Sequence, residues 1–243
     1  MRHPLLIALA AGLLAGCAGP GSPDGTWINQ PIIDAAREGI PLHEALLAHG
    51  PVLEWRVDSQ RGQAVFSNGF ETPQGDLAAT ENGRWQVSYR DAHQDELEVR
   101  GDELVQHANN YGPEQRFARP QREAENGALL GSSFEWALYD AYLGGGEWKI
   151  SEGVGRGGLV LFHPDGRLEG LPGADRYALC LAGDCASMTE GDSLWLQLGN
   201  QGASWLFERD GDRLRILEAV NRAAADEFPD YRPGRQAWLL ERD

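Results

Sequence analysis

The chain has 243 residues, a formal net charge of −16 and 42% hydrophobic residues. A phosphate backbone repels so acidic a protein, which excludes nucleic acid as a partner and disfavours docking of the body on anionic lipid headgroups. The hydrophobic content and the eight Trp residues supply material for a core, so a disordered chain is excluded as well.

The first 17 residues have the pattern of an export signal. Arg2 and His3 precede an apolar run, residues 4–14, that is too short to remain in a bilayer as a spanning helix. The stretch Leu14-Ala-Gly-Cys17 resembles the lipobox of bacterial lipoproteins. The resemblance implies cleavage after Gly16, a diacylglycerol group on the Cys17 thiol, and acylation of the new amine by a fatty acid such as palmitate. We therefore expect residues 1–16 to be a signal peptide and Cys17 to be the lipid-attachment site.

The residue after Cys17 gives an expectation about location. Gram-negative lipoproteins that stay at the inner membrane commonly carry Asp there, whereas this chain has Ala18. The resemblance thus implies a lipid anchor in the outer membrane and a body that faces the periplasm. Residues 17–25 are rich in Pro, Gly and Ser, which predicts a lipidated N-terminus and tether.

Two β-rich domains are expected after the tether, at residues 26–120 and 128–243, with the polar segment 119–127 between them. In the first, residues 32–49 have helical apolar spacing, and Gly39 and Pro41 should divide them into two short helices. Period-two patterns separated by turn signals such as Asn68-Gly69 then predict short strands. These strands are residues 52–57, 63–66, 85–89, 96–99 and 104–107.

The second domain shows the same kind of pattern. Residues 128–143 and 221–228 are predicted to be helical. Strands are predicted at residues 147–150, 159–162, 167–169, 177–179, 194–198, 204–208, 214–217 and 237–240. The expected fold class is mainly β, with one or two small antiparallel β-barrel or β-sandwich domains and short accessory helices.

The two halves also share a short sequence match. Gly101-Asp-Glu-Leu104 aligns with Gly211-Asp-Arg-Leu214. A tandem duplication of β-domains would explain the match. The alternative is that Gly-Asp turns are common in all-β proteins.

Cys180 and Cys185 remain as a pair if Cys17 carries lipid, and an oxidising compartment favours a disulfide between them. The competing interpretation is a redox-active or metal-binding pair. Four residues separate the two cysteines, so they do not form a C-x-x-C motif, and no second pair lies nearby. We predict a structural disulfide.

Several motifs suggest catalysis but lack the residues that it needs. Gly153-Val-Gly155-Arg-Gly-Gly158 satisfies G-x-G-x-x-G, yet a strand-like run follows where a dinucleotide site needs a helix. We expect a hairpin loop there. Gly191-Asp-Ser193-Leu194 resembles the block of the GDSL esterases, but no histidine follows His163, so Ser193 lacks a base in the expected order. Isolated histidines such as His43 and His49, six positions apart, predict no metal site. We expect no enzyme activity and no cofactor.

Two further resemblances concern the fold. Residues 162–177, which include Asp165-Gly-Arg167, look like part of the META domain of bacterial secreted lipoproteins. Ala174-Asp175 stands where that domain has Cys-Asn. Gly25-Thr-Trp27 and Gly146-Glu-Trp148 resemble the Gly-x-Trp start of lipocalin-like barrels, in which the Trp usually plugs one barrel end. Neither resemblance implies catalytic residues.

We expect a membrane-anchored, non-catalytic binding module whose ligand is a lipid or other apolar molecule held in a barrel. The candidate pocket or core residues are Trp55, Trp85, Trp148, Trp195 and Trp205. The alternative is an acidic interaction module, an inhibitor or accessory subunit, for a basic envelope protein.

Overall fold

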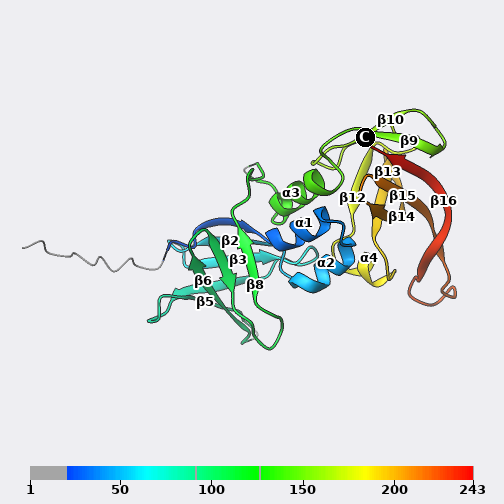
Figure 1. The fold of residues 1–243 in the computed structure, drawn as a ribbon. Coiled ribbons are helices and arrows are strands. Elements are labelled where there is room, and N and C mark those ends of the chain that lie inside the picture. The colour runs from blue at the N-terminus through cyan, green and yellow to red at the C-terminus, as the bar shows by residue number, and fades with distance from the viewer. Residues whose placement is uncertain (1–20, 91, 126, 243) are drawn as a thin grey trace, which may run out of the picture.

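A computed structural model describes residues 21–90, 92–125 and 127–242 of the chain. The expectations for the signal peptide, Cys17 and Ala18 lie outside these residues. The described chain forms two eight-stranded antiparallel sheets and four short helices, which confirms the predicted mainly β fold with accessory helices (Figure 1).

The first sheet is a closed barrel in which every strand pairs with the next one along the chain. Pairing of Ile28 with Ala118 closes the circle between the first and last strands. Buried side chains such as Trp27, Trp55 and Phe117 occupy its interior. The strands are β1 Gly25–Ile28, β2 Glu54–Asp58, β3 Gln63–Ser67, β4 Gln74–Ala79, β5 Trp85–Ser88, β6 Gln94–Arg100, β7 Glu103–Gln106 and β8 Gln115–Ala118.

The second sheet is a curved meander (Figure 1) whose first and last strands also pair. Its two edge strands approach each other through a bridge between Arg167 and Arg176 and a 2.8 Å hydrogen bond from Leu168 N to the Asp175 carbonyl. The sheet is therefore barrel-like. Its strands are β9 Trp148–Gly153, β10 Leu159–Phe162, β11 Leu168–Glu169, β12 Arg176–Leu179, β13 Ser193–Leu198, β14 Gln201–Asp210, β15 Arg213–Asn221 and β16 Tyr231–Glu241.

Three helices lie between the two sheets (Figure 1). Helices α1 (Gln30–Arg37) and α2 (Leu42–His49) are inserted between β1 and β2, and α3 (Ser132–Tyr142) precedes β9. The sequence break at Gly39 and Pro41 separates α1 from α2, as predicted. The Asn29 side chain begins α1 by accepting a hydrogen bond from Ile32 N. The fourth helix, α4 (Asp184–Ser187), connects β12 to β13.

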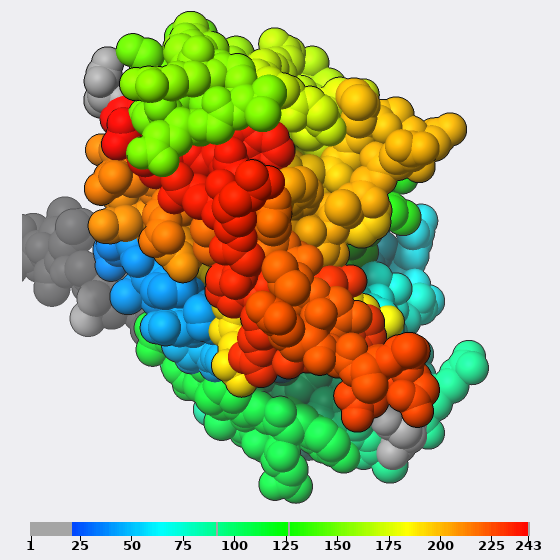
Figure 2. Space-filling view, turned by 90° about the vertical axis from the view of Figure 1, so that its right-hand side faces the viewer, coloured from blue at the N-terminus to red at the C-terminus, as the bar shows by residue number. Residues whose placement is uncertain are grey.

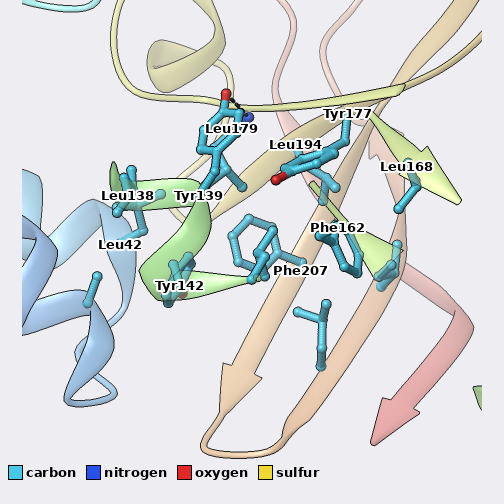
Figure 3. Close-up of a cluster of buried hydrophobic side chains, with 14 of the residues drawn as sticks. Leu42, Leu138, Tyr139, Tyr142, Phe162, Leu168, Tyr177, Leu179, Leu194 and Phe207 are labelled. Carbon is cyan, nitrogen blue, oxygen red and sulfur yellow. Dashed lines mark hydrogen bonds between the residues drawn. The ribbon is translucent and has the colours of Figure 1, made fainter. Parts of the chain in front are cut away.

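Helix α3 fills the concave side of the second sheet. Figure 3 shows Tyr139 and Tyr142 of this helix facing Phe162, Tyr177 and Phe207 from the strands. The Tyr139 ring lies 5.0 Å from the Tyr177 ring, and the Tyr139 hydroxyl accepts a 3.0 Å hydrogen bond from Leu179 N. The same buried cluster continues into α1 and α2, so the helices join the two halves through one hydrophobic core.

Two buried carboxylates fix this helical layer, one from each half of the chain. Glu54 on β2 accepts hydrogen bonds from Ser133 N at 2.9 Å and Phe134 N at 3.0 Å, at the start of α3. Asp192, just before β13, accepts hydrogen bonds from Leu42 N at 2.8 Å and His43 N at 2.7 Å, at the start of α2. Each carboxylate meets the positive end of a helix that belongs to the other half.

The two sheets repeat one arrangement around their first strands. Arg119, which follows β8, covers the Trp27 ring at 3.6 Å, and Arg242, which follows β16, covers the Trp148 ring at 4.5 Å. Each Trp also donates its indole N–H to a carbonyl shortly before it in the chain, that of Pro23 or of Leu143. The Gly-Asp match of the two halves falls on the β6–β7 turn and the β14–β15 turn, which in both sheets joins the sixth strand to the seventh.

Some local predictions were wrong. Residues 222–230 form a hairpin loop rather than a helix, because the Asn221 carboxamide oxygen accepts hydrogen bonds from Ala223 N and Asp230 N and closes the loop. No strand was predicted at β1, β4 or β8, and no helix at α4; β4 and β8 each contain one large apolar residue, Leu77 or Phe117. The glycines of the G-x-G-x-x-G motif lie in the β9–β10 hairpin, as expected.

The contact of Glu54 with α3 predicts a specific effect of pH on stability. Burial raises the pKa of Glu54, so the folded chain keeps this proton at a pH at which the unfolded chain has lost it. The free energy of unfolding should therefore fall as the pH rises from the ordinary Glu range to the raised pKa. Glu54→Gln should reduce this slope, because the amide oxygen still accepts the N–H groups of α3 and carries no charge.

Glu54→Ala is the comparison for Glu54→Gln. It leaves the two N–H groups of α3 without a protein acceptor and should lower the free energy of unfolding by about 1–3 kcal/mol. Urea unfolding at several pH values measures both variants. An unchanged pH slope in Glu54→Gln would contradict this role.

Candidate functional site

An apolar cleft of about 650 Å³ lies where the two halves meet. Helix α2, the β3–β4 connection and the segment from Cys180 to Ser193 form its walls. Its apolar lining includes Leu46, Leu47, Leu53, Phe70 and Leu181. The volume is within the range of about 300–1,000 Å³ that is typical of small-molecule sites, and sites of this kind often lie between domains.

Two large apolar side chains of the cleft are exposed to solvent. The exposed fraction is 81% for Leu47 and 66% for Phe70. Phe70 packs closely on Gly183, where φ is +70° and an added Cβ would lie 2.5 Å from the Phe70 ring. This contact holds the β3–β4 connection of the first half against the β12–β13 connection of the second half.

The polar end of the cleft is formed by His43 and Asp192. His43 Nδ1 lies 2.8 Å from Asp192 Oδ1, and its side chain is 38% exposed, whereas that of Asp192 is 5% exposed. Because the carboxylate accepts, Nδ1 carries the proton of this hydrogen bond. No hydrogen bond to Nε2 is present among the residues that the structure describes. This nitrogen is thus free to interact with a bound molecule.

Asp192 is held in place by more than His43. It also accepts the two helix N–H groups of α2 and a 3.4 Å hydrogen bond from the Tyr142 hydroxyl. Burial, and then the negative charge of Asp192, raise the pKa of Tyr142, so this hydroxyl stays a donor. The orientation of the His43 ring is therefore set by a buried network.

A disulfide forms one wall of the cleft. Cys180 and Cys185 are bonded, which agrees with the predicted pair, and the bond joins the residue after β12 to the first turn of α4. Residues 180–183 and Ala186 line the cleft directly. In the chain-entropy model a loop this short contributes about 2 kcal/mol to stability.

None of the five candidate tryptophans lines this cleft. Trp55 and Trp148 are fully buried in the two cores, and Trp85 packs against the first core. The Trp205 ring lies 5.1 Å from the Trp238 ring, tilted by 55°, at the edge of the second core. Trp195 lies on the outer surface, 44% exposed, across Gly202. A binding role for these residues stays a prediction.

The segment Gly191-Asp-Ser193-Leu194, which resembles the GDSL block, does not form a catalytic triad. The structure brings His43 to Asp192, a pairing across 149 positions that no sequence motif indicated. Ser193 follows Asp192 and is buried, but no hydrogen bond joins its hydroxyl to His43 in the described part of the chain. The serine therefore lacks the activating contact of a nucleophile.

Searches for related proteins give no further information about the site. No family model, no curated protein and no solved structure matches the chain. Within the described ranges, no three side chains of His, Cys, Asp or Glu are grouped so that they could hold a metal ion. No described helix has the length and apolar character needed to cross a membrane.

Asp192→Ala should destabilise the protein and release the His43 ring, because it removes the acceptor of four hydrogen bonds. We expect the free energy of unfolding to fall by about 1.5–3 kcal/mol, the usual effect of losing a hydrogen bond to a charged group. Urea unfolding gives the free energy, and amide exchange at Leu42 and His43 should be faster in the variant.

The control is Glu190→Gln, since Glu190 lies two positions away, is 84% exposed and, among the described residues, forms an ion pair with Arg232 alone. It should unfold like the unsubstituted protein. Equal stability of Asp192→Ala and the unsubstituted protein would show that this network does not fix α2.

Proposed function

We propose that the protein is a lipid-anchored, non-catalytic binding module, and that the apolar cleft between the two halves holds its ligand. The cleft carries the proposal because it combines exposed apolar side chains with one oriented polar group. An exposed apolar surface of this kind often marks a binding site. The filled cores of both sheets favour the cleft over the barrel interiors as the site.

The chemistry of the walls indicates the class of ligand. Leu46, Leu47, Leu53 and Phe70 suit an alkyl chain. His43 Nε2 at the polar end can accept a hydrogen bond from a hydroxyl or carboxylic acid, or donate one to a carboxylate when the ring is protonated. The ligand is therefore a single-chain amphiphile such as a fatty acid.

The start of the described chain is consistent with a short distance between anchor and body. Pro23 is buried and Asp24 accepts hydrogen bonds from Ser59 N and the Ser59 hydroxyl, so the chain is attached to the first barrel from residue 23. Six residues, 17–22, then separate the proposed lipid from the body. Fully extended they span about 20 Å, which would keep the first barrel near the outer membrane.

The charge distribution does not favour the alternative of an acidic interaction module. Residues 21–120 have 16 acidic and 8 basic side chains, and residues 121–243 have 21 and 12. Both halves are acidic to a similar degree. A basic partner would gain most from a focused acidic face, and this sequence does not concentrate its charge in one half.

The cleft predicts the behaviour of a matched pair of leucine variants. Leu47→Glu places a charge beside the ligand chain and should weaken binding of a dansylated fatty acid at least about tenfold. Leu129 is exposed to the same degree, 82% against 81%, and is not among the residues lining the cleft. Leu129→Glu should bind like the unsubstituted protein.

Dansyl fluorescence follows the titration, and His43→Gln tests the polar end in the same assay. His43→Gln should weaken the fatty acid more than an alkane-like probe of equal length. No saturable binding in the unsubstituted protein, or equal loss in Leu47→Glu and Leu129→Glu, would refute the proposed site.

The anchor makes a separate prediction. Mass spectrometry of the protein from bacterial membranes should find the mature chain beginning at Cys17 with acyl chains attached. Cys17→Ser should appear in the soluble fraction instead, because one Cys carries all of the proposed lipid. The soluble Cys17→Ser protein should still bind the fatty acid, so the two parts of the proposal can fail separately.

A further inference from the structure

A second cleft borders helices α1 and α3 and shares no lining residue with the apolar one. It has a volume of about 1,380 Å³ and is open to solvent. Its walls come from the end of α1, the glycine-rich segments at 144–146 and 157, the β14–β15 turn and the C-terminal end of β16. In Figure 2 these segments, coloured blue, green, orange and red, meet along one edge of the face.

The cleft gathers cations that have no carboxylate partner. Lys149, the single lysine of the chain, lines it together with Arg156 and Arg209. In the described part of the chain none of these three forms an ion pair, although most other arginines do. In a protein of net charge −16, three cations without a described ion-pair partner in one cleft are a specific local feature.

Arg209 is the least solvated of the three. Its Nη1 donates to the Ala36 carbonyl at 3.2 Å, its guanidinium lies 4.8 Å from the Tyr142 ring, and its Nε is buried with no hydrogen-bond partner among the described residues. Burial lowers the pKa of this guanidinium. No described carboxylate forms an ion pair with Arg209, although the charge of Asp212 acts on it at longer range. Burying a cation is costly, and an anion in the cleft would offset that cost.

The described acidic residues of the cleft do not form ion pairs with these three cations. Asp212 is paired with Arg242 at 2.8 Å, and Glu241 is paired with Arg213 at 3.2 Å. Asp140 and Glu147 are exposed on the rim and form no ion pair within the described chain. Such carboxylates can accept hydrogen bonds from hydroxyl groups of a ligand.

We propose that this cleft binds a phosphorylated polyol, with Lys149, Arg156 and Arg209 contacting the phosphate and the rim carboxylates contacting hydroxyl groups. Guanidinium and phosphate form paired, charge-assisted hydrogen bonds, and a dianion compensates several cations at once. The phosphate can belong to a soluble sugar phosphate or to the headgroup of a lipid. This site does not depend on the fatty-acid site proposed above.

Isothermal titration calorimetry with glucose 6-phosphate tests the soluble form, with glucose as the uncharged comparison. Flotation with vesicles of phosphatidylcholine with and without phosphatidylinositol phosphate tests the headgroup form. Lys149→Gln and Arg156→Gln remove exposed cations of the cleft, so the fold should be unaffected. Arg222→Gln is the matched control, because Arg222 is also exposed and unpaired in the described chain but lies in the β15–β16 loop.

We expect one of the two phosphate probes to bind, and both cleft variants to weaken it about fivefold or more while Arg222→Gln changes it less than about twofold. Raising the salt concentration should weaken binding in the unsubstituted protein. Binding of glucose 6-phosphate would identify a soluble ligand, and binding of the phosphoinositide vesicles alone would identify a headgroup. Absence of binding to both probes, or an equal loss in Arg222→Gln, would overturn the proposal.

Discussion

The arrangement of the whole molecule depends on two buried carboxylates that meet helix N-termini across the boundary between the halves. Glu54 reaches from the first barrel to α3, and Asp192 reaches from the second sheet to α2. An isolated buried carboxylate would be strongly unfavourable. Here the N–H groups and the helix dipole offset part of this cost only while both halves keep their positions. The contacts therefore favour one relative orientation of the two sheets. Both proposed sites depend on that orientation.

The two halves share one strand arrangement and differ in what fills the interior of each sheet. Each begins with a strand whose Trp lies under an Arg that follows the eighth strand, and the Gly-Asp turn occupies the same place in both. These coincidences of sequence and topology support a tandem duplication more directly than the sequence match alone. The first barrel closes around its own side chains. The second remains open between β11 and β12 and accepts α3 on its concave side.

Local features of this chain were predictable, and long-range ones were not. Gly39 and Pro41 end and begin helices through their own backbone preferences, so a short window of sequence suffices. Strands β4 and β8 have few apolar residues, so their sequences show no strand pattern. Part of their stabilisation comes from pairing with neighbours in a closed barrel. The disulfide was predicted from the expected oxidising compartment and from the spacing of Cys180 and Cys185. No local sequence pattern predicts the pairing of His43 with Asp192. The two residues are far apart in the sequence, and neither is unusual within its own segment.

The same packing explains why concave surfaces occur at the edges of the helical layer. Aromatic side chains of α3 occupy the space that an open second barrel would offer to a ligand. Two gaps beside the helices differ in their lining. One gap is lined by α2 and the disulfide-bonded segment, where apolar side chains dominate. The other is lined by the ends of strands and by glycine-rich turns, where charged side chains can reach solvent. Two chemically different clefts are thus the consequence of filling a β-barrel with a helix.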